Sequence, residues 1–279
     1  MLFLNLYMNK KKSEFNRIIN DIKSIKIQGA RNVAKAALKA YTLSPSKSSK
    51  NKLLNSRPTE PMMHHVLDLA EKKTLYNKII EHFDEAQENI NKFVFKLIKN
   101  KERIFTHCHS TNVVNSLIYS KKNNKKFEVY NTETRPLYQG RKTANELRRA
   151  GIKVTMFVDS AGAVALEREN KKDKIYTTKV FIGADALLKG GIINKIGSGM
   201  FAELANKNKI PFYVIADSWK FTKNKIPLEQ RSINEVWDKT PKNVKIKNPS
   251  FEFVDKKYIS GIVTEFGIMK YDEFVRKMK

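Results

Sequence analysis

The sequence is short of cysteine, of acidic residues and of long apolar runs, and each shortage narrows what the protein can be. Cys108 is the single cysteine, so no disulfide can form within the chain, and this usage is typical of a reducing compartment. No apolar run approaches the length of a membrane span, and Met1–Tyr7 is too short and poorly flanked for a signal peptide. We therefore expect a soluble, cytoplasmic protein that has no contact with a membrane.

Several motifs of cofactor and metal chemistry are also missing. No GxGxxG falls between an expected strand and an expected helix, and no GxxxxGK[ST] occurs, so neither a dinucleotide site nor a nucleoside triphosphate site is supported. His64 and His65 lack the other ligands of a metal site and are interpreted as residues at the start of a helix. We expect neither a metal nor a cofactor.

Acidic residues are outnumbered by basic ones. The 54 lysines and arginines against 28 aspartates and glutamates give a formal net charge of +26. The lysines are scattered through every expected element, which indicates a compositional bias rather than a nucleic-acid-binding patch. We expect weak, salt-sensitive association with polyanions but no specific nucleic-acid partner. An anionic substrate would benefit from such a field.

With 279 residues and 41% hydrophobic content, the chain can bury a core in one large domain or two smaller ones. Over residues 1–100 the apolar residues recur at helical spacing, and this pattern predicts a helical domain. Ser44–Lys52 is interpreted as a polar linker within it. The expected helices are Ser13–Ile25, Val33–Tyr41, Met62–Lys72 and Leu75–Leu97.

Two loops of this helical part are candidate anion sites. Gly29 allows a tight turn and a close backbone approach directly before a helix start, where backbone N–H groups attract anions. Arg57 stands in a loop that Pro58 and Pro61 fix in a non-helical course, and a fixed arginine suits bidentate phosphate binding. A plain turn between helices and an exposed arginine are the alternative interpretations.

From Glu102 onward, short apolar runs alternate with helices, which predicts an α/β fold with a parallel sheet covered on both faces. The fold class is therefore an N-terminal helical domain followed by a Rossmann-like parallel-sheet domain over residues 101–279. The expected helices are Val113–Tyr119, Gly140–Ala150 and Met200–Lys207. The expected strands are Arg103–His107, Phe127–Asn131, Lys153–Val158, Lys179–Ile182, Phe212–Ala216 and Gly261–Thr264.

Polar residues follow five of these strands, at the sheet edge where open α/β folds bind ligands. Loops are polar in general, but these sets together hold a cysteine, several carboxylates, an arginine and a lysine. The sets are Cys108–Asn112, Glu133–Pro136, Asp159–Ser160, Gly183–Asp185 and Asp217–Lys220.

Cys108 lies at a turn from strand to helix, where the helix dipole lowers the pKa of a thiol. Ser110, Thr111 and Asn112 follow at once and can cap the helix or bind phosphate oxygens. The alternative is a small buried hydrophobic residue with capping residues after it. His107 and His109 flank the cysteine, but neighbouring strand residues point to opposite faces, so neither ring need face the thiol.

Four segments resemble one superfamily, which comprises the archaeal ribose-1,5-bisphosphate isomerases, the methylthioribose-1-phosphate isomerases and the alpha, beta and delta regulatory subunits of translation initiation factor 2B. The resemblance runs from Gly29 through Arg57–Thr59 to Val263–Gly267, nearly the whole chain. The segments are Thr106–Ser110, Gly183–Leu187, Gly191–Gly197 and Asp217–Phe221.

The resemblance implies that Cys108 and Asp185 form an acid–base pair, because the isomerases use a cysteine and an aspartate in this way. The alternative interpretations are that Asp185 is a turn or capping residue and that Lys195 is a solubilising residue at a sheet edge. In the first loop, Gln28 stands where the family often has arginine, and Arg31 where it often has a small residue. The implied substrate contacts are Gln28, Gly29, Ala30, Arg31, Arg57, Ser110, Thr111, Asn112, Asn194, Lys195 and Lys220.

The resemblance and the compact length favour a ribose-1,5-bisphosphate isomerase of nucleoside 5′-monophosphate degradation, with its site in the cleft between the two domains. A homo-oligomer, either a dimer or a trimer of dimers (a hexamer), and activation by AMP are implied by the same branch. A methylthioribose-1-phosphate isomerase and a non-catalytic regulatory subunit of the translation factor are the alternatives. The intact pair of Cys108 and Asp185 favours an enzyme.

Overall fold

The structure is a computed structural model that describes residues 2–167 and 175–279. The chain forms two compact units. Unit 1 consists of the chain up to Glu85 together with Trp219–Pro227, and unit 2 consists of Ala86–Ser218 and Leu228–Lys279. The segment Trp219–Pro227 thus follows residues of unit 2 along the chain but belongs to unit 1.

Unit 1 is helical, as the apolar spacing predicts. Phe15, Ile18 and Ile22 of α1 pack with buried residues of α2, α3 and α4 in one hydrophobic cluster. A second cluster joins α2 and α4 to Phe83 and to Trp219 from the returning segment. The helices are α1 (Leu2–Lys23), α2 (Ala30–Leu43), α3 (Lys47–Ser56), α4 (Pro61–Glu71) and the beginning of α5 (Tyr76–Leu97).

The expected polar linker over Ser44–Lys52 is wrong, because most of it belongs to α3. The side chain of Ser46 caps this helix by accepting a hydrogen bond from the backbone N–H of Ser49 at 3.1 Å. Leu53 is the one apolar residue of α3 that is fully buried, so the helix has almost no apolar stripe to reveal it. The proline at 61 also begins α4 rather than preventing a helix, since the first helical position needs no N–H donor.

Unit 2 is built on a mostly parallel sheet, and all six expected strands are present. Within the described residues the strand order is β10-β9-β7-β4-β1-β2-β3, and the unexpected β10 alone runs antiparallel to its neighbour. The strands are β1 (Glu102–Thr106), β2 (Phe127–Thr132), β3 (Lys153–Phe157), β4 (Lys179–Ile182), β7 (Phe212–Ile215), β9 (Gly261–Thr264) and β10 (Gly267–Met269).

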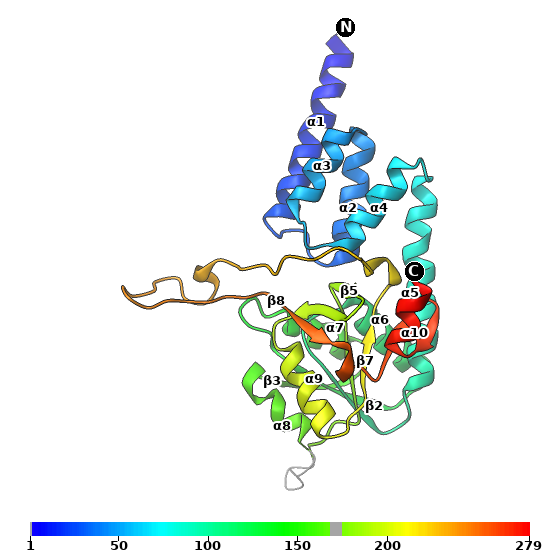
Figure 1. The fold of residues 1–279 in the computed structure, drawn as a ribbon, viewed down its shortest axis with the longest axis vertical. Helices are drawn as coiled ribbons and strands as arrows, with labels where there is room; N and C mark the ends of the chain where they lie inside the picture. The colour runs from blue at the N-terminus through cyan, green and yellow to red at the C-terminus, as the bar shows by residue number, and fades with distance from the viewer. Residues whose placement is uncertain (1, 168–174) are drawn as a thin grey trace. The chain divides into compact units, whose positions relative to one another are not determined.

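Helices cover both faces of this sheet. Ile104 of β1 belongs to a core cluster with α5, α6 and α7, whereas the ring of Phe105 lies 4.9 Å from that of Phe201 on α9. Because adjacent strand residues point to opposite faces, these contacts place helices on either side. The helices are α6 (Thr111–Lys122), α7 (Gln139–Arg149), α8 (Gly162–Leu166), α9 (Ser198–Lys207) and α10 (Tyr271–Lys277), drawn in Figure 1.

A second, antiparallel sheet of unit 2 was not expected from the sequence. It pairs β5 (Ala186–Leu188), β6 (Gly191–Lys195) and β8 (Phe251–Asp255) in that order. The tight approach of its strands requires a glycine, since a Cβ atom on Gly191 would lie 2.0 Å from the carbonyl oxygen of Val254. This small sheet carries Asp185, Asn194 and Lys195 on or directly beside its strands.

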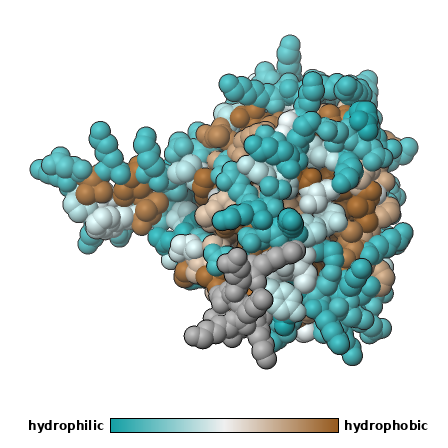
Figure 2. All heavy atoms as spheres, turned by 60° about the horizontal axis from the view of Figure 1, so that its bottom comes forward, coloured by the Kyte–Doolittle hydropathy of each residue, from teal (hydrophilic) through white to brown (hydrophobic). Residues whose placement is uncertain are grey.

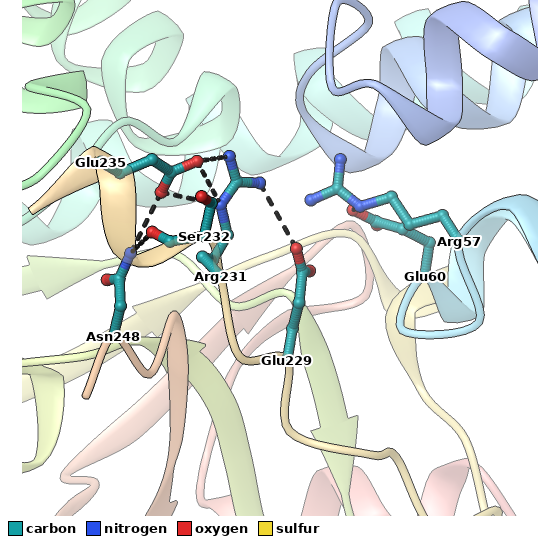
Figure 3. A network of polar contacts seen from close by, with 7 residues as sticks. All are labelled: Arg57, Glu60, Glu229, Arg231, Ser232, Glu235 and Asn248. Carbon is teal, nitrogen blue, oxygen red and sulfur yellow. Dashed lines mark hydrogen bonds and ion pairs between the residues drawn. The ribbon is translucent and has the colours of Figure 1, made fainter. Parts of the chain in front are cut away.

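Residues 228–250 form an arm that runs away from the sheets of unit 2 (Figure 1). At the base of the arm, a network of hydrogen bonds joins the outgoing segment of the chain to the returning one (Figure 3). The Arg231 Nε donates hydrogen bonds to both carboxylate oxygens of Glu235 at 3.0 and 3.1 Å, and Nη1 donates to Glu229 at 3.3 Å. Asn248, on the returning segment of the arm, donates to Glu235 at 3.2 Å and to the backbone carbonyl of Ser232 at 2.9 Å.

None of the helices within residues 2–167 and 175–279 combines the length and the apolar character that crossing a membrane requires.

The junction of β2 and α7 depends on Gly140, and we expect Gly140→Ala to lower the free energy of unfolding by about 3 kcal/mol. A Cβ atom there would lie 1.7 Å from the backbone carbonyl oxygen of Thr132, which has no freedom to move aside. Urea unfolding followed by circular dichroism measures the change.

Gly190→Ala is the matched control, because a Cβ atom on Gly190 would meet only the ring of Phe253, at an ordinary contact distance of 3.6 Å. We expect its effect to stay within about 0.5 kcal/mol. Equal effects of the two substitutions would contradict the close approach at Gly140.

Candidate functional site

The loops that follow β1, β2 and β3 meet at the backbone of Cys108. The N–H of Cys108 donates a hydrogen bond to Thr134 Oγ1 at 3.0 Å, and Thr143 Oγ1 donates one to the Cys108 carbonyl at 2.9 Å. Thr134 is held in turn by Asp159, whose Oδ1 accepts from the Thr134 N–H at 2.8 Å. Three of the five polar sets expected at the carboxyl edge of the sheet therefore converge.

The Cys108 thiol is protonated at neutral pH. Burial and the negative charges of Asp185 and Asp159 raise its pKa to about 12, against the opposing effects of a hydrogen bond from the His109 backbone and the charge of Lys195. The expectation of a lowered pKa is therefore wrong. A helix terminus contributes about 1 kcal/mol, and loss of water around a thiolate outweighs it here.

Asp185 lies beside Asn194 across the β5–β6 pair. The Asp185 N–H donates to the Ile193 carbonyl at 2.9 Å. The Asn194 amide faces Asp185 Oδ2 at 3.3 Å and the Gly183 carbonyl at 3.3 Å. Because a carboxylate and a carbonyl are both acceptors, the amide nitrogen is the atom that faces them, and it donates to both. The carboxylate of Asp185 is thereby oriented by its neighbouring strand.

Gly183 brings the loop after β4 against the loop after β1. A Cβ atom on Gly183 would lie 2.5 Å from Ser110 Oγ and 2.6 Å from Ser110 Cβ. Only a residue without a side chain fits at this distance, so the segment that leads to Asp185 and the segment that follows Cys108 are in direct contact. The Ser110 hydroxyl also caps α6 by accepting from the Val113 N–H at 3.5 Å.

Lys195 is a buried cation, with 6% of its surface exposed. It lies on β6, the central strand of the small sheet, so it is not a solubilising residue at a sheet edge. Burial lowers its pKa, with a contribution from Arg231, whereas the charges of Glu235 and Asp185 act in the opposite direction. A cation held this way can offset negative charge on a bound group.

The two histidines that flank Cys108 have other partners than its thiol. His107 is buried, with Nδ1 against Thr132 Oγ1 and Nε2 against the Ile196 carbonyl at 2.8 Å. Nδ1 of His109 lies 3.0 Å from Thr143 Oγ1. Burial lowers the pKa of each ring to about 4, so both are neutral at pH 7. The interpretation against a cysteine–histidine pair agrees with this geometry.

Asn112 has a structural partner. Its side-chain amide donates to Gln87 Oε1 at 3.0 Å, and Gln87 Nε2 donates to the Asn91 side chain at 2.7 Å, so this residue ties α6 to α5. Thr111 is the first residue of α6. A capping or packing role thus accounts for part of the polar segment that follows Cys108.

Unit 1 holds the other candidates. Gly29 adopts φ +85° and directly precedes α2, which begins with the buried Ala30, and Gln28 beside it is exposed. Arg31 forms an ion pair with Asp84 of α5. The substitution of arginine for a small residue in this loop therefore serves a contact within the unit.

Two further cations of unit 1 are among the expected contacts, Arg57, which is half-buried, and Lys220, which is buried. Arg57 Nε lies 3.3 Å from Glu60 Oε1, and the two side chains are drawn side by side in Figure 3. The interpretation of Arg57 as an exposed arginine is wrong, because its side chain is only 11% exposed. Lys220 is buried in a single 3-10 turn, Ser218–Lys220.

Two residues at the site were missed from the sequence. Thr143 lies inside α7 and carries no local signal, since its role depends on which loop the helix packs against. Thr134 stands in one of the five polar sets, but only its contact with Cys108 distinguishes it from an ordinary loop residue.

The sequence is similar to known proteins over most of its length. The model of the initiation factor 2 subunit family matches residues 23–271. The chain is 34% identical to the ribose 1,5-bisphosphate isomerase of Methanocaldococcus jannaschii over 89% of each protein. It is 29% identical to the methylthioribose-1-phosphate isomerase of Fervidobacterium nodosum, over 95% of this chain and 89% of that protein.

A solved structure has the same fold. The translation initiation factor eIF-2B of Pyrococcus horikoshii superposes with a TM-score of 0.79 at 25% identity, covering 92% of this chain and 96% of that one. The family model and these relatives each span most of the sequence, as the quoted motifs indicate. The chain belongs to the initiation factor 2 subunit family.

Proposed function

We propose that this protein is an isomerase that converts ribose 1,5-bisphosphate into ribulose 1,5-bisphosphate, with Cys108 and Asp185 as its acid–base pair. The observation that carries the proposal is the direct contact of Gly183 with Ser110, which brings the segment that leads to Asp185 against the segment that follows Cys108. Asn194 orients the carboxylate of Asp185. The similarity to archaeal proteins named ribose 1,5-bisphosphate isomerase, over nearly the full length of both chains, supports this substrate.

The reaction requires two hydrogen transfers. In ribose 1,5-bisphosphate the C1 oxygen carries a phosphate and the ring closes through the C4 oxygen. One hydrogen moves from C2 to C1. The C2 hydroxyl loses its proton and becomes a carbonyl, and the C4 oxygen gains a proton as the C1–O4 bond breaks. These transfers need one group that holds a proton at rest and another that can accept one.

Cys108 is the group that holds the proton, because its pKa is raised to about 12. In the proposed mechanism the thiol protonates the C4 oxygen as the ring opens, and the resulting thiolate takes the proton from C2. The thiol then delivers that proton to C1. Asp185 accepts the proton of the C2 hydroxyl and returns it to the thiolate, so that both groups end as they began.

Fixed cations and amides would bind the phosphates. Lys195 is buried close enough to Cys108 and Asp185 for its charge to act on both. Its compact ammonium suits a phosphate oxygen or developing negative charge on the sugar. The resemblance assigns further substrate contacts to Ser110–Asn112 and Asn194 in unit 2 and to Gln28–Arg31, Arg57 and Lys220 in unit 1.

A methylthioribose-1-phosphate isomerase is the second candidate. Proteins of that name are 29% identical to this chain over 95% of its length and 35% identical over 70% of it. The hydrogen transfers are the same, so Cys108 and Asp185 would serve unchanged. The two candidates differ in whether a phosphate or a methylthio group occupies the far end of the sugar.

A non-catalytic regulatory subunit of the translation factor remains the alternative outside enzymes. It is favoured by the likeness to the eIF-2B structure of P. horikoshii. Tight binding to the initiation factor without turnover of either sugar phosphate would support it.

We expect purified protein to form ribulose 1,5-bisphosphate from ribose 1,5-bisphosphate, and Cys108→Ser and Asp185→Asn each to lower kcat by at least about 1,000-fold. Substrate affinity should change little in Asp185→Asn, because the amide keeps the shape of the carboxylate. NMR spectroscopy measures the product, and calorimetric titration measures binding. AMP is added in parallel reactions, since the resembling branch is activated by it.

Methylthioribose 1-phosphate serves as the competing substrate in the same assay. Turnover of that sugar alone would move the proposal to the second candidate. Failure of both sugars, with and without AMP, would contradict an isomerase. Loss of binding together with turnover in Asp185→Asn would indicate a structural role for this residue.

The coupling between the two groups gives a separate test. Removing the charge of Asp185 removes one cause of the raised pKa of Cys108, so in Asp185→Asn this pKa should fall, and the thiolate fraction at pH 9 should rise. The rate of alkylation by iodoacetamide against pH reports the pKa, and Cys108 is the only thiol that can react. An unchanged profile would contradict the proximity of the two groups.

We also propose that the protein is a homo-oligomer that associates through its C-terminal part, with the arm of residues 228–250 covered by a second copy. Figure 2 shows apolar side chains among hydrophilic ones on this arm, which points to the left. Trp237 is 48% exposed, and such a side chain in a row of exposed apolar residues is typical of an interface. The row consists of Leu228, Ile233, Val236, Trp237 and Val244.

We expect Trp237→Ser with Ile233→Ser to shift the protein toward the monomer, because the pair removes two of the largest apolar side chains of the arm. Light scattering after size-exclusion chromatography measures the mass at several concentrations. Tyr7→Ser, on another exposed aromatic residue outside the arm, is the control. A wild-type monomer at all concentrations would contradict the proposal.

A further inference from the structure

We propose that Thr134 and Thr143 are positioning residues that hold the backbone of Cys108 in a strained conformation and so aim its thiol. The inference rests on the proposed role of the thiol in the isomerisation. Neither threonine has an expected contact with substrate. Both threonines and Cys108 lie within unit 2.

The backbone of Cys108 is in an unfavourable conformation. Its φ of +65° lies in the left-handed region, which a residue with a side chain occupies at a cost of about 1 kcal/mol. Such a conformation persists only where the surroundings impose it, and it decides the direction of the Cα–Cβ bond and therefore of the thiol. Something other than local preference must hold this residue.

Two hydroxyl groups hold it from opposite sides. The N–H of Cys108 donates to Thr134 Oγ1 at 3.0 Å, and the carbonyl of Cys108 accepts from Thr143 Oγ1 at 2.9 Å. Both peptide groups of the residue are thus bonded to side chains from other elements, where a strand or a helix would use backbone partners. The two threonines are buried, with Thr134 fully covered and Thr143 1% exposed.

Each threonine is itself anchored. Asp159 accepts from the N–H of Thr134 at 2.8 Å and from the N–H of Arg135 at 2.6 Å, which fixes a loop whose Thr134 also has a positive φ of +64°. Thr143 Oγ1 gives its hydrogen to the Cys108 carbonyl, so Nδ1 of His109, at 3.0 Å, must be the donor to it. These hydrogen bonds hold the loops after β1, β2 and β3 and helix α7 together around Cys108.

The positioning keeps the thiol where its neighbours act on it. The charged groups that influence Cys108 are Asp185, Asp159 and Lys195, together with the peptide dipole of His109. A change in the direction of the thiol alters its distance to all of them and its contact with water. The apparent pKa of Cys108 therefore reports the position of the thiol independently of any reaction.

The experiment compares Thr143→Val and Thr134→Val, which remove each hydroxyl at nearly constant volume, with Thr143→Ser, which keeps it. Thr178→Val is the matched control, because Thr178 Oγ1 also bonds the N–H and the carbonyl of one residue, Arg103, near the start of β1. The rate of iodoacetamide labelling is measured by intact mass from pH 7 to 11. The kcat and KM for ribose 1,5-bisphosphate and the thermal midpoint are measured on the same preparations.

We expect the apparent pKa of Cys108 to fall in both hydroxyl-free variants, with labelling at pH 8 faster by about tenfold for each unit of that fall. The kcat should fall at least about tenfold with KM changed less than about twofold, since the thiol and not the binding groups is displaced. Thr143→Ser and Thr178→Val should keep the wild-type labelling profile and kcat.

Wild-type labelling profiles in both Thr143→Val and Thr134→Val would overturn the inference. So would an equal shift in Thr178→Val, because a general loosening of the fold would then explain the result. The two threonines lie on different elements, so if one variant does not fold, the other decides. Absence of isomerase activity would contradict the proposed function, while the labelling profiles would still test the positioning.

Discussion

The candidate site depends on the convergence of loops at the carboxyl ends of parallel strands. Parallel pairing of β1 with β2 and of β2 with β3 brings the ends of these strands to one edge, so the residues that follow them must meet. The left-handed backbone of Cys108 is stable only because this meeting supplies partners for both of its peptide groups. The sheet, through its loops, therefore sets the direction of the thiol.

The small antiparallel sheet holds Asp185 and Lys195, the other groups of the proposed chemistry. Asp185 precedes β5, and Lys195 ends β6, so a hairpin of the second sheet holds a carboxylate and an ammonium in fixed relation. Burial makes the charge of Lys195 costly, and the cost is reduced because the negative charge of Asp185 acts on it. Gly183 allows this hairpin to approach Ser110, which joins the two sheets at the site.

Much of the fold follows from the sequence, because parallel strands buried on both faces appear as continuous apolar runs, such as residues 180–182 of β4. The helix α3 and the hairpin β5–β6 do not. The helix α3 buries little apolar surface. The hairpin has strands as short as three residues, and its strand β6 also pairs with β8, which lies far along the sequence. Cys108 and Asp185 stood out through a family motif, whereas Thr143 acquires its role only from the packing of α7.

Because its pKa is raised, the resting thiol of Cys108 carries its proton. A thiolate ready at rest would need cations close to the sulfur, and the charge of Lys195 is opposed by the charges of two carboxylates, Asp185 and Asp159. The balance favours the neutral thiol, which agrees with the proposed role of Cys108 as the group that holds a proton at rest. The large positive charge of the whole chain, +26, can then act on the approach of an anionic substrate without forcing the thiol to ionise, because salt screens distant exposed charges more strongly than the half-buried carboxylates beside the thiol.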